Sequence, residues 1–217
     1  MGIRNTKILI VEDEALVRSL ITSLLEGDGM IIRSAANAAE ARKITSEFTP
    51  DVAVLDIELG DGPAGIDLAH ILRMQFPEIG LVFLTHIPEP RVIGVENSNI
   101  PKNAAYLRKD LMGNADQLRK AIYAAQKNRI PKDLREDKTS SHKLAGVSRS
   151  QLEVLRLVAM GMSNQEIASR RGTTVRAVEN LIKRSFQAAG VNGETAGNLR
   201  VVAAREFIQV AGMPHAR

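Results

Sequence analysis

Lys7-Ile8-Leu9-Ile10-Val11-Glu12-Asp13 is a short apolar run that ends in two acids. A continuous run of branched apolar residues is typical of a strand that is buried on both faces, as in a parallel sheet. Four similar runs follow along the chain, at Met30–Ile32, Asp51–Leu55, Ile79–Leu84 and Ala104–Leu107. We therefore expect five strands.

The segments between these strands have the spacing of amphipathic helices. Residues 16–25 place their leucine, isoleucine and valine side chains on one helical face. Asn37 and Glu40 form a capping box that opens a second helix, and a third, over residues 66–76, ends at a proline. A weak helix is expected between the last two strands, and a stronger one over 112–126. The alternation predicts an α/β fold with a doubly wound, five-stranded parallel sheet.

Polar side chains follow the strands at their carboxyl ends, which such a sheet brings to one edge, where ligands bind. Glu12 and Asp13 follow the first strand, Asp56 the third, Thr85 the fourth and Lys109 the fifth. Clustered carboxylates repel one another unless a cation compensates them. Oxygen ligands without His or Cys favour Mg²⁺, which commonly bridges to a phosphate.

A phosphoryl group would suit this set of residues. Lys109 can supply a counter-charge and Thr85 a hydroxyl donor, while Asp56 can act as a nucleophile that forms an acyl phosphate. Each residue taken singly is also compatible with a polar strand end that faces water. Four suitable residue types at four strand ends favour the functional interpretation.

Residues 5–127 resemble the receiver domain of bacterial two-component response regulators. The resemblance rests on Ile8–Glu14, Asp51–Asp56, Leu84-Thr85 and Tyr106–Asp110. It implies a flavodoxin-like fold in which Asp56 accepts phosphate from a sensor histidine kinase. It further implies that Glu12, Asp13, the Asp56 carboxylate and the backbone carbonyl of Glu58 hold Mg²⁺, that Thr85 and Lys109 bind phosphoryl oxygens, and that Tyr106 turns inward with Thr85 on activation.

The chain departs from the family's pattern near Asp56 and Thr85. The family usually has a proline four residues after the aspartate and a glycine eight residues after it, whereas this chain has Gly60 and then Gly65, nine residues on. We therefore expect one extra residue in the Gly60–Gly65 loop and a reshaped surface towards the kinase. His86 stands where a small residue is usual, and its imidazole is expected to affect the access of phosphodonors and the phosphoryl lifetime.

The net charge reverses between the two halves of the chain. The 217 residues carry a formal charge of +4, but residues 1–127 contain 14 Lys and Arg against 17 Asp and Glu, and residues 128–217 contain 15 against 8. A basic half suggests a polyanion as its partner. Aromatic residues make up only 3% of the chain, which argues against a stacking surface for single strands and favours duplex DNA.

Composition excludes several other classes of protein. Because the chain has no cysteine, it cannot contain disulfides, thiolate zinc sites, iron–sulfur clusters or a cysteine nucleophile. No apolar run approaches the roughly 18 residues of a membrane span, and the start lacks a signal-peptide pattern. We therefore expect a cytoplasmic protein without a membrane partner.

Residues 128–145 mix charges of both signs with a proline, several hydroxyl residues and few apolar ones. This composition predicts an exposed, partly flexible linker between two domains.

Four helices and no strand are expected after the linker. Capping boxes open the first two helices at Ser148 and Ser163, each with Gln or Glu three residues on. Thr174 caps the third, and the fourth runs from about Thr195 to Val210. Short helices joined by a glycine turn, followed by a basic helix, indicate a helix-turn-helix in a small all-α four-helix domain.

Residues 146–212 resemble the LuxR-type DNA-binding domain, on the patterns Ser148–Ala159, Gly161–Ala168, Val178–Asn180 and Gly190-Val191. The resemblance places the third helix in the major groove and makes the fourth a dimerisation helix. The expected groove contacts are Arg176, Glu179, Asn180 and Lys183, and the expected DNA-backbone contacts are Asn164, Thr174 and Arg184. The alternative for Arg176 and Glu179 is an intrahelical ion pair on a solvated face.

The leading hypothesis is a response regulator of the NarL/FixJ family, which is a transcriptional regulator and not an enzyme. It would bind duplex DNA under the control of Mg²⁺-dependent phosphorylation of Asp56. Its partners would be a sensor histidine kinase, a second copy in the active state and, as a candidate, RNA polymerase. One alternative is a phosphorylation-independent DNA binder whose receiver serves dimerisation. Another is a Mg²⁺-dependent phosphohydrolase. Such enzymes commonly need a second aspartate two residues after the nucleophile, where this chain has Glu58, and this argues against that alternative.

Overall fold

The computed structural model of the chain describes residues 5–60, 65–111, 115–138, 142–192 and 197–213. These residues form two compact units, each with a buried apolar core of its own. The first unit contains the described residues of 1–86 and 98–137, and the second contains those of 87–97 and 138–217.

The first unit is built on a five-stranded sheet of β1 (Lys7–Val11), β2 (Ile31–Ala35), β3 (Val52–Leu55), β4 (Gly80–Thr85) and β5 (Ala104–Arg108). All strand pairs are parallel, and the order is β2-β1-β3-β4-β5. Every residue of β3 and β4 is buried, which explains their continuous apolar runs. The predicted α/β class and the five parallel strands are confirmed.

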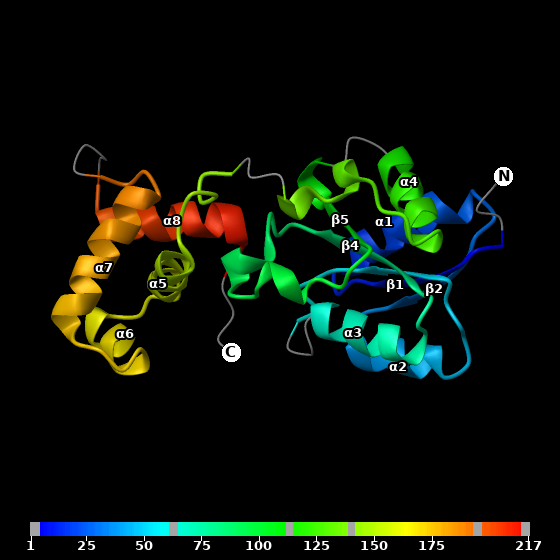
Figure 1. Cartoon of the computed structure of the whole chain (residues 1–217), viewed down its shortest axis with the longest axis horizontal. Helices are drawn as coiled ribbons and strands as arrows, with labels where there is room; N and C mark the ends of the chain where they lie inside the picture. The colour runs from blue at the N-terminus through cyan, green and yellow to red at the C-terminus, as the bar shows by residue number, and fades with distance from the viewer. Residues whose placement is uncertain (1–4, 61–64, 112–114, 139–141, 193–196, 214–217) are drawn as a thin grey trace. The chain divides into compact units, whose positions relative to one another are not determined.

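Helices cover both faces of this sheet. Figure 1 shows α1 (Ala15–Glu26) and α4 (Ala115–Gln126) on one face, and α2 (Ala38–Thr45) and α3 (Gly65–Gln75) on the other. The Asn37 side chain caps α2 as predicted by accepting the backbone N–H of Glu40 at 2.9 Å. The return bond of the predicted capping box differs, because the Glu40 carboxylate accepts the N–H of Ala36 at 2.8 Å. Residues 112–114, which the sequence assigns to the last helix, lie outside the described residues.

The apolar residues of α1 divide into two stripes, and the prediction of a single core face is wrong in this respect. Ile21 and Leu25 are buried in the sheet core, whereas Leu16 is 74% and Leu20 56% exposed. The apolar residues predicted to form one face span more of the helix circumference than a single packing face can bury. The outer leucines therefore lie on the surface of the first unit.

The predicted weak helix between β4 and β5 is absent from the described chain. Two 3-10 turns, Pro90–Ile93 and Asn97–Asn99, take its place. The prolines in this stretch lack the backbone N–H that an α-helix needs, and Gly94 adopts a left-handed conformation with a φ of 84° that ends the first turn.

Residues 87–97 pack into the second unit, which no sequence pattern indicates. Val92 is 1% exposed and belongs to the core of that unit. The Arg91 guanidinium donates to the backbone carbonyl of Val147 at 2.7 Å and contacts the Glu89 carboxylate at 2.7 Å. Glu89 also contacts His142 Nε2 at 2.9 Å. A stretch that follows β4 is thus structurally part of the C-terminal unit.

The predicted exposed linker, residues 128–145, is partly buried and contains local structure. It contains the 3-10 turns Lys132–Leu134 and Glu136–Lys138. Leu134, Asp137 and Leu144 are buried, so the prediction of exposure is wrong for these residues. Leu134 joins the core of the first unit and Leu144 that of the second, which gives both ends of the stretch an apolar anchor.

The second unit is a bundle of α5 (Arg149–Ala159), α6 (Asn164–Arg170), α7 (Val175–Ala188) and α8 (Leu199–Ala211). The capping boxes at Ser148 and Ser163 and the Thr174 cap form as predicted. The last helix begins at Leu199 under an Asn198 cap; residues 193–196, where its start is predicted, lie outside the described residues. In the described part of the chain, no helix has the length and apolar character needed to cross a membrane.

Candidate functional site

Three charged side chains from three strand ends meet at the carboxyl edge of the sheet. The Lys109 ammonium lies 2.7 Å from Asp56 Oδ2 and 2.7 Å from Glu12 Oε2. All three side chains are almost fully buried. Because β1, β3 and β5 are parallel members of one sheet, residues far apart in sequence converge here, as the sequence predicts.

Backbone donors hold the second oxygen of Asp56. Its Oδ1 accepts the N–H of Ile57 at 2.6 Å and that of Glu58 at 3.4 Å. Both carboxylate oxygens therefore have partners, and the Lys109 ammonium and the Ile57 N–H fix the orientation of the group. A carboxylate held in this way is a positioned nucleophile.

Glu12, Asp13 and Asp56 form an acidic cluster with the composition of a cation site. Each offers one oxygen, and these oxygens lie within 4.8 Å of one another. Within the described residues, Glu12 Oε1 is buried without a hydrogen-bond partner, which leaves a lone pair available to a metal. An oxygen-only ligand set suits a hard divalent cation.

The electrostatics of the cluster raise the pKa of Glu12 and keep Lys109 charged. Burial, together with the negative charges of Asp56 and Asp13, raises the pKa of Glu12 to about 7, although Lys109 opposes this. Burial lowers the pKa of Lys109, but the Asp56 and Glu12 carboxylates outweigh it and raise the pKa above its usual range. Glu12 therefore changes protonation state near neutral pH.

Thr85 is the last residue of β4, and Tyr106 lies in the middle of the neighbouring strand β5. Both are fully buried, and the Tyr106 ring already points inward, with its centroid 6.2 Å from that of Phe83. His86 is exposed. Gly60 has a φ of 61° and lies beside Asp13, while residues 61–64, where the longer loop is predicted, lie outside the described residues.

The predicted DNA-contacting residues lie in the second unit, mostly on one helix. Val178, Ile182 and Phe186 bury one side of α7 in the core. The residues expected to read the groove and the backbone from this helix and its cap are all exposed: Thr174, Arg176, Glu179, Asn180, Lys183 and Arg184. Within the described residues no ion pair joins Arg176 to Glu179.

Asn164 is placed differently from the other predicted DNA contacts. It is partly buried at the start of α6, and its Oδ1 accepts a hydrogen bond from Arg200 Nη1 of α8 at 2.9 Å. This side chain therefore ties two helices of the bundle together. Arg200 also donates to the Met162 carbonyl, a contact that the sequence pattern does not reveal.

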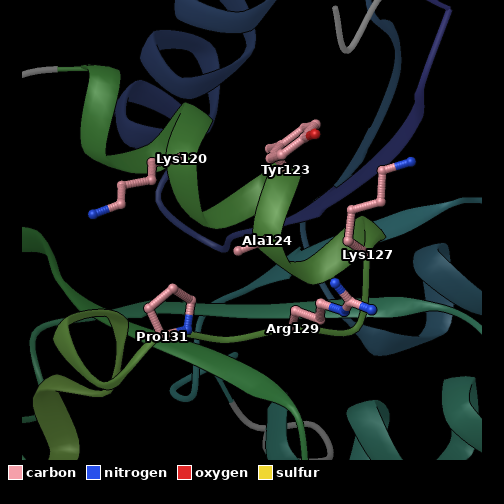
Figure 2. Close-up of a pocket in the computed structure, with 6 residues that line it drawn as sticks. All are labelled: Lys120, Tyr123, Ala124, Lys127, Arg129 and Pro131. Atoms are coloured by element: carbon pink, nitrogen blue, oxygen red, sulfur yellow. The ribbon is translucent and has the colours of Figure 1, made fainter. Parts of the chain in front are cut away.

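A pocket of about 570 Å³ lies in the first unit, apart from the carboxylate cluster. Figure 2 shows that α4 and the chain returning from it form its walls. Its lining combines cations with apolar surface: Lys120, Tyr123, Ala124, Lys127, Arg129 and Pro131. None of these residues is among those predicted from the sequence to have a function.

The family profile of the response regulator receiver domain matches residues 8–123, which is more than half of the chain. The protein therefore belongs to the response regulators that carry this domain. Over 192 aligned residues it is 26% identical to the oxygen regulatory protein NreC of Staphylococcus aureus, covering 80% of this chain and 86% of NreC.

Solved structures of RcsB have the same fold over most of the chain. RcsB from Salmonella enterica serovar Typhimurium, bound to promoter DNA in the presence of the phosphomimetic BeF3−, matches with a TM-score of 0.58 and 20% identity over 95% of this chain and all of that one. A second RcsB–DNA complex matches with a TM-score of 0.56 and 20% identity, over 94% of this chain and 99% of that one. The likeness extends through the helical second unit.

Proposed function

We propose that this protein is a DNA-binding transcriptional regulator that a sensor histidine kinase controls by phosphorylating Asp56. The observation that carries the proposal is the Lys109 ammonium placed 2.7 Å from both the Asp56 and Glu12 carboxylates. A fixed cation beside a buried, oriented carboxylate suits phosphoryl transfer, which depends on positioning and on charge stabilisation. Membership of the receiver family supports this role and argues against a phosphohydrolase.

The chemistry is a transfer between two nucleophiles. An Asp56 oxygen attacks phosphorus, the bond from phosphorus to the kinase imidazole breaks, and an acyl phosphate forms. Glu12, Asp13, Asp56 and the backbone carbonyl of Glu58 would hold Mg²⁺, which supplies positive charge to the phosphoryl oxygens when it is bound. The Lys109 ammonium and the Thr85 hydroxyl would bind the remaining oxygens.

The response to phosphorylation would pass from β4 to β5. Thr85 pairs with Arg108 in the sheet, and Phe83 pairs with Tyr106, so a shift of Thr85 towards a phosphoryl oxygen acts on the strand that carries Tyr106. A phosphoryl group that favours one of two packings shifts their populations.

We place the active form in the cytoplasm as a homodimer that contacts RNA polymerase.

The DNA-binding role rests on α7. Its polar face carries Arg176, Asn180 and Lys183 outward while its apolar face is buried. Arginine and lysine suit guanine in the major groove, and asparagine suits adenine. The DNA complexes of RcsB, which has the same fold, support this assignment.

The proposal is tested with genomic DNA fragments captured by the wild-type protein in Mg²⁺ and beryllium fluoride. We expect the affinity for the captured fragments to rise at least about tenfold over the untreated protein, which corresponds to 1.4 kcal/mol. Asp56→Ala should show no rise, and Lys183→Ala should bind weakly in both states. Lys102→Ala, which removes an exposed lysine of the first unit, is the matched control. Equal affinity of Asp56→Ala and the treated wild type would refute phosphorylation control.

Mg²⁺ should stabilise the protein more at about pH 8 than at about pH 6. Because the pKa of Glu12 is raised to about 7, protons compete with a cation for this carboxylate at the lower pH. The raised pKa also means that the metal-free protein loses stability as the pH rises from about 4.5, the usual pKa of a glutamate, to about 7, and that this loss levels off above about pH 7.

The measurement is the Mg²⁺-induced change in the thermal unfolding midpoint at the two pH values. Glu12→Gln cannot ionise, so its increment should be small and nearly independent of pH. An equal increment at both pH values in the wild type would show that Glu12 does not take part.

A further inference from the structure

The stretch Pro131–Asp137, here called the edge segment, lies along β5 in the first unit. Arg135 forms a parallel bridge with Tyr106, and Leu134 is 1% exposed in the core beneath α4 and the sheet. β5 is the last strand of the sheet, and an edge strand presents unpaired N–H groups on its outer side. The edge segment covers part of that side.

Glu136 of the edge segment satisfies one of these N–H groups. Its Oε2 accepts the backbone N–H of Arg108 at 2.5 Å, and its Oε1 accepts Nε2 of Gln117 at 2.7 Å. Arg108 is the last residue of β5, and Lys109 follows it directly. One carboxylate thus links the end of β5, at Arg108, to α4. Arg108 directly precedes Lys109, whose ammonium lies in the phosphoacceptor site.

The residues on either side of Glu136 keep it in place. The Arg135 guanidinium binds both oxygens of Asp137 at 2.8 Å. Asp137 is 4% exposed, and hydrogen bonding to this carboxylate, despite burial, raises the pKa of Arg135 above its usual range. A bidentate pair of this kind holds planar groups in one geometry. The Glu136 side chain therefore meets β5 from a fixed backbone.

We propose that Glu136 is a positioning residue for phosphoryl transfer at Asp56, acting through the Arg108 backbone to place the Lys109 ammonium. This inference rests on the function proposed above. Lys109 must reach two carboxylates at 2.7 Å each, and β5 ends at the residue before it. Without Glu136 the Arg108 N–H would lose its protein partner and the strand end would be free to fray. A displacement of about 1 Å can cost a catalytic site a hundredfold in rate.

The test compares Glu136→Ala, Glu136→Gln and wild type with acetyl phosphate as the phosphodonor. In this reaction an Asp56 oxygen attacks phosphorus and acetate leaves, so intact-protein mass spectrometry counts the acyl phosphate formed. We expect Glu136→Ala to lower the maximal rate about 10-fold to 100-fold, while the Mg²⁺ dissociation constant stays unchanged because Lys109 is not a metal ligand. Glu136→Gln keeps an acceptor for Arg108 and should remain within about threefold of wild type.

A second readout needs neither metal nor phosphodonor. Amide hydrogen exchange at the Arg108 N–H should become faster in Glu136→Ala and stay slow in Glu136→Gln. Asp133→Ala is the matched control, because Asp133 belongs to the same segment but forms an exposed ion pair with Lys120. This variant should behave as wild type in both assays.

The outcomes separate this inference from the function on which it rests. A wild type that acetyl phosphate fails to phosphorylate, and whose DNA affinity beryllium fluoride fails to raise, would overturn the proposed function, and this inference with it. A wild type that is phosphorylated, with Glu136→Ala at the same rate, would overturn the inference only. Parallel loss of Mg²⁺ affinity and phosphorylation in Glu136→Ala would show a structural role and would also overturn it.

Discussion

A Lys109→Ala variant is expected to lose measurable phosphorylation of Asp56, and its metal-free form should be destabilised by about 3 kcal/mol at pH 8. The Lys109 side chain is 7% exposed and is within hydrogen-bond distance of two carboxylates that are themselves buried. Removing it leaves Asp56 and Glu12 facing each other without a cation. An unpaired buried charge lowers the free energy of unfolding by more than the ion pair had raised it, because neither water nor a counter-charge replaces the lost partner.

The destabilisation of Lys109→Ala should depend on pH and on Mg²⁺. At about pH 6, Glu12 can take up a proton and relieve the repulsion, because its pKa is already raised in the wild type. Saturating Mg²⁺ should restore most of the stability at pH 8, since it supplies the missing positive charge. It should not restore phosphorylation, because the ammonium that holds a phosphoryl oxygen is still missing.

Both effects can be followed in the same protein. The two tyrosines, Tyr106 and Tyr123, belong to the first unit and the chain has no tryptophan, so tyrosine fluorescence in urea reports the unfolding of that unit. Lys102→Ala removes an exposed lysine near the start of β5 and should change neither stability nor phosphorylation. A Lys109→Ala protein that is phosphorylated within tenfold of the wild-type rate would contradict the role of this lysine.

The carboxylate site could be predicted because its signals are local. Asp56 and Lys109 each follow an apolar run that identifies a buried strand, and parallel strands necessarily bring their carboxyl ends together. Residue type and strand position were then enough to infer the cluster. The distances of 2.7 Å from Lys109 to Asp56 and Glu12 confirm that the side chains meet.

Glu136 and Val92 could not be predicted, because their partners are set by tertiary packing. Glu136 is one acid among mixed charges, and nothing in its neighbourhood points to the Arg108 N–H. Val92 lies in a proline-containing stretch whose weak helical pattern gave the wrong secondary structure. It belongs to the core of the second unit although it precedes β5 in sequence. Composition predicts the average exposure of a segment, but it cannot identify the single apolar residue that is buried in a core.

Gly65 shows how the altered loop after Asp56 still meets a constraint of the fold. It begins α3, and its backbone N–H donates to the Ile57 carbonyl at 2.9 Å. A Cβ built on Gly65 would lie 1.7 Å from the carbonyl oxygen of Asp56 and 2.8 Å from its carbonyl carbon. The glycine therefore permits α3 to approach the end of β3, although it stands one residue later than the family's pattern requires.

Gly65→Ala should accordingly destabilise the first unit by about 3 kcal/mol and slow the phosphorylation of Asp56 by acetyl phosphate at least about tenfold. The added methyl group meets backbone, which cannot rotate away, so α3 must move off β3 or Asp56 must move with its carbonyl. Gly27→Ala is the matched control, because Gly27 has a helical φ of −62° and no atom within 4 Å of an added Cβ. That variant should keep or slightly raise stability, by about 0.4–1 kcal/mol. Equal urea midpoints for Gly65→Ala and wild type, followed by tyrosine fluorescence, would show that the β3–α3 approach tolerates a side chain.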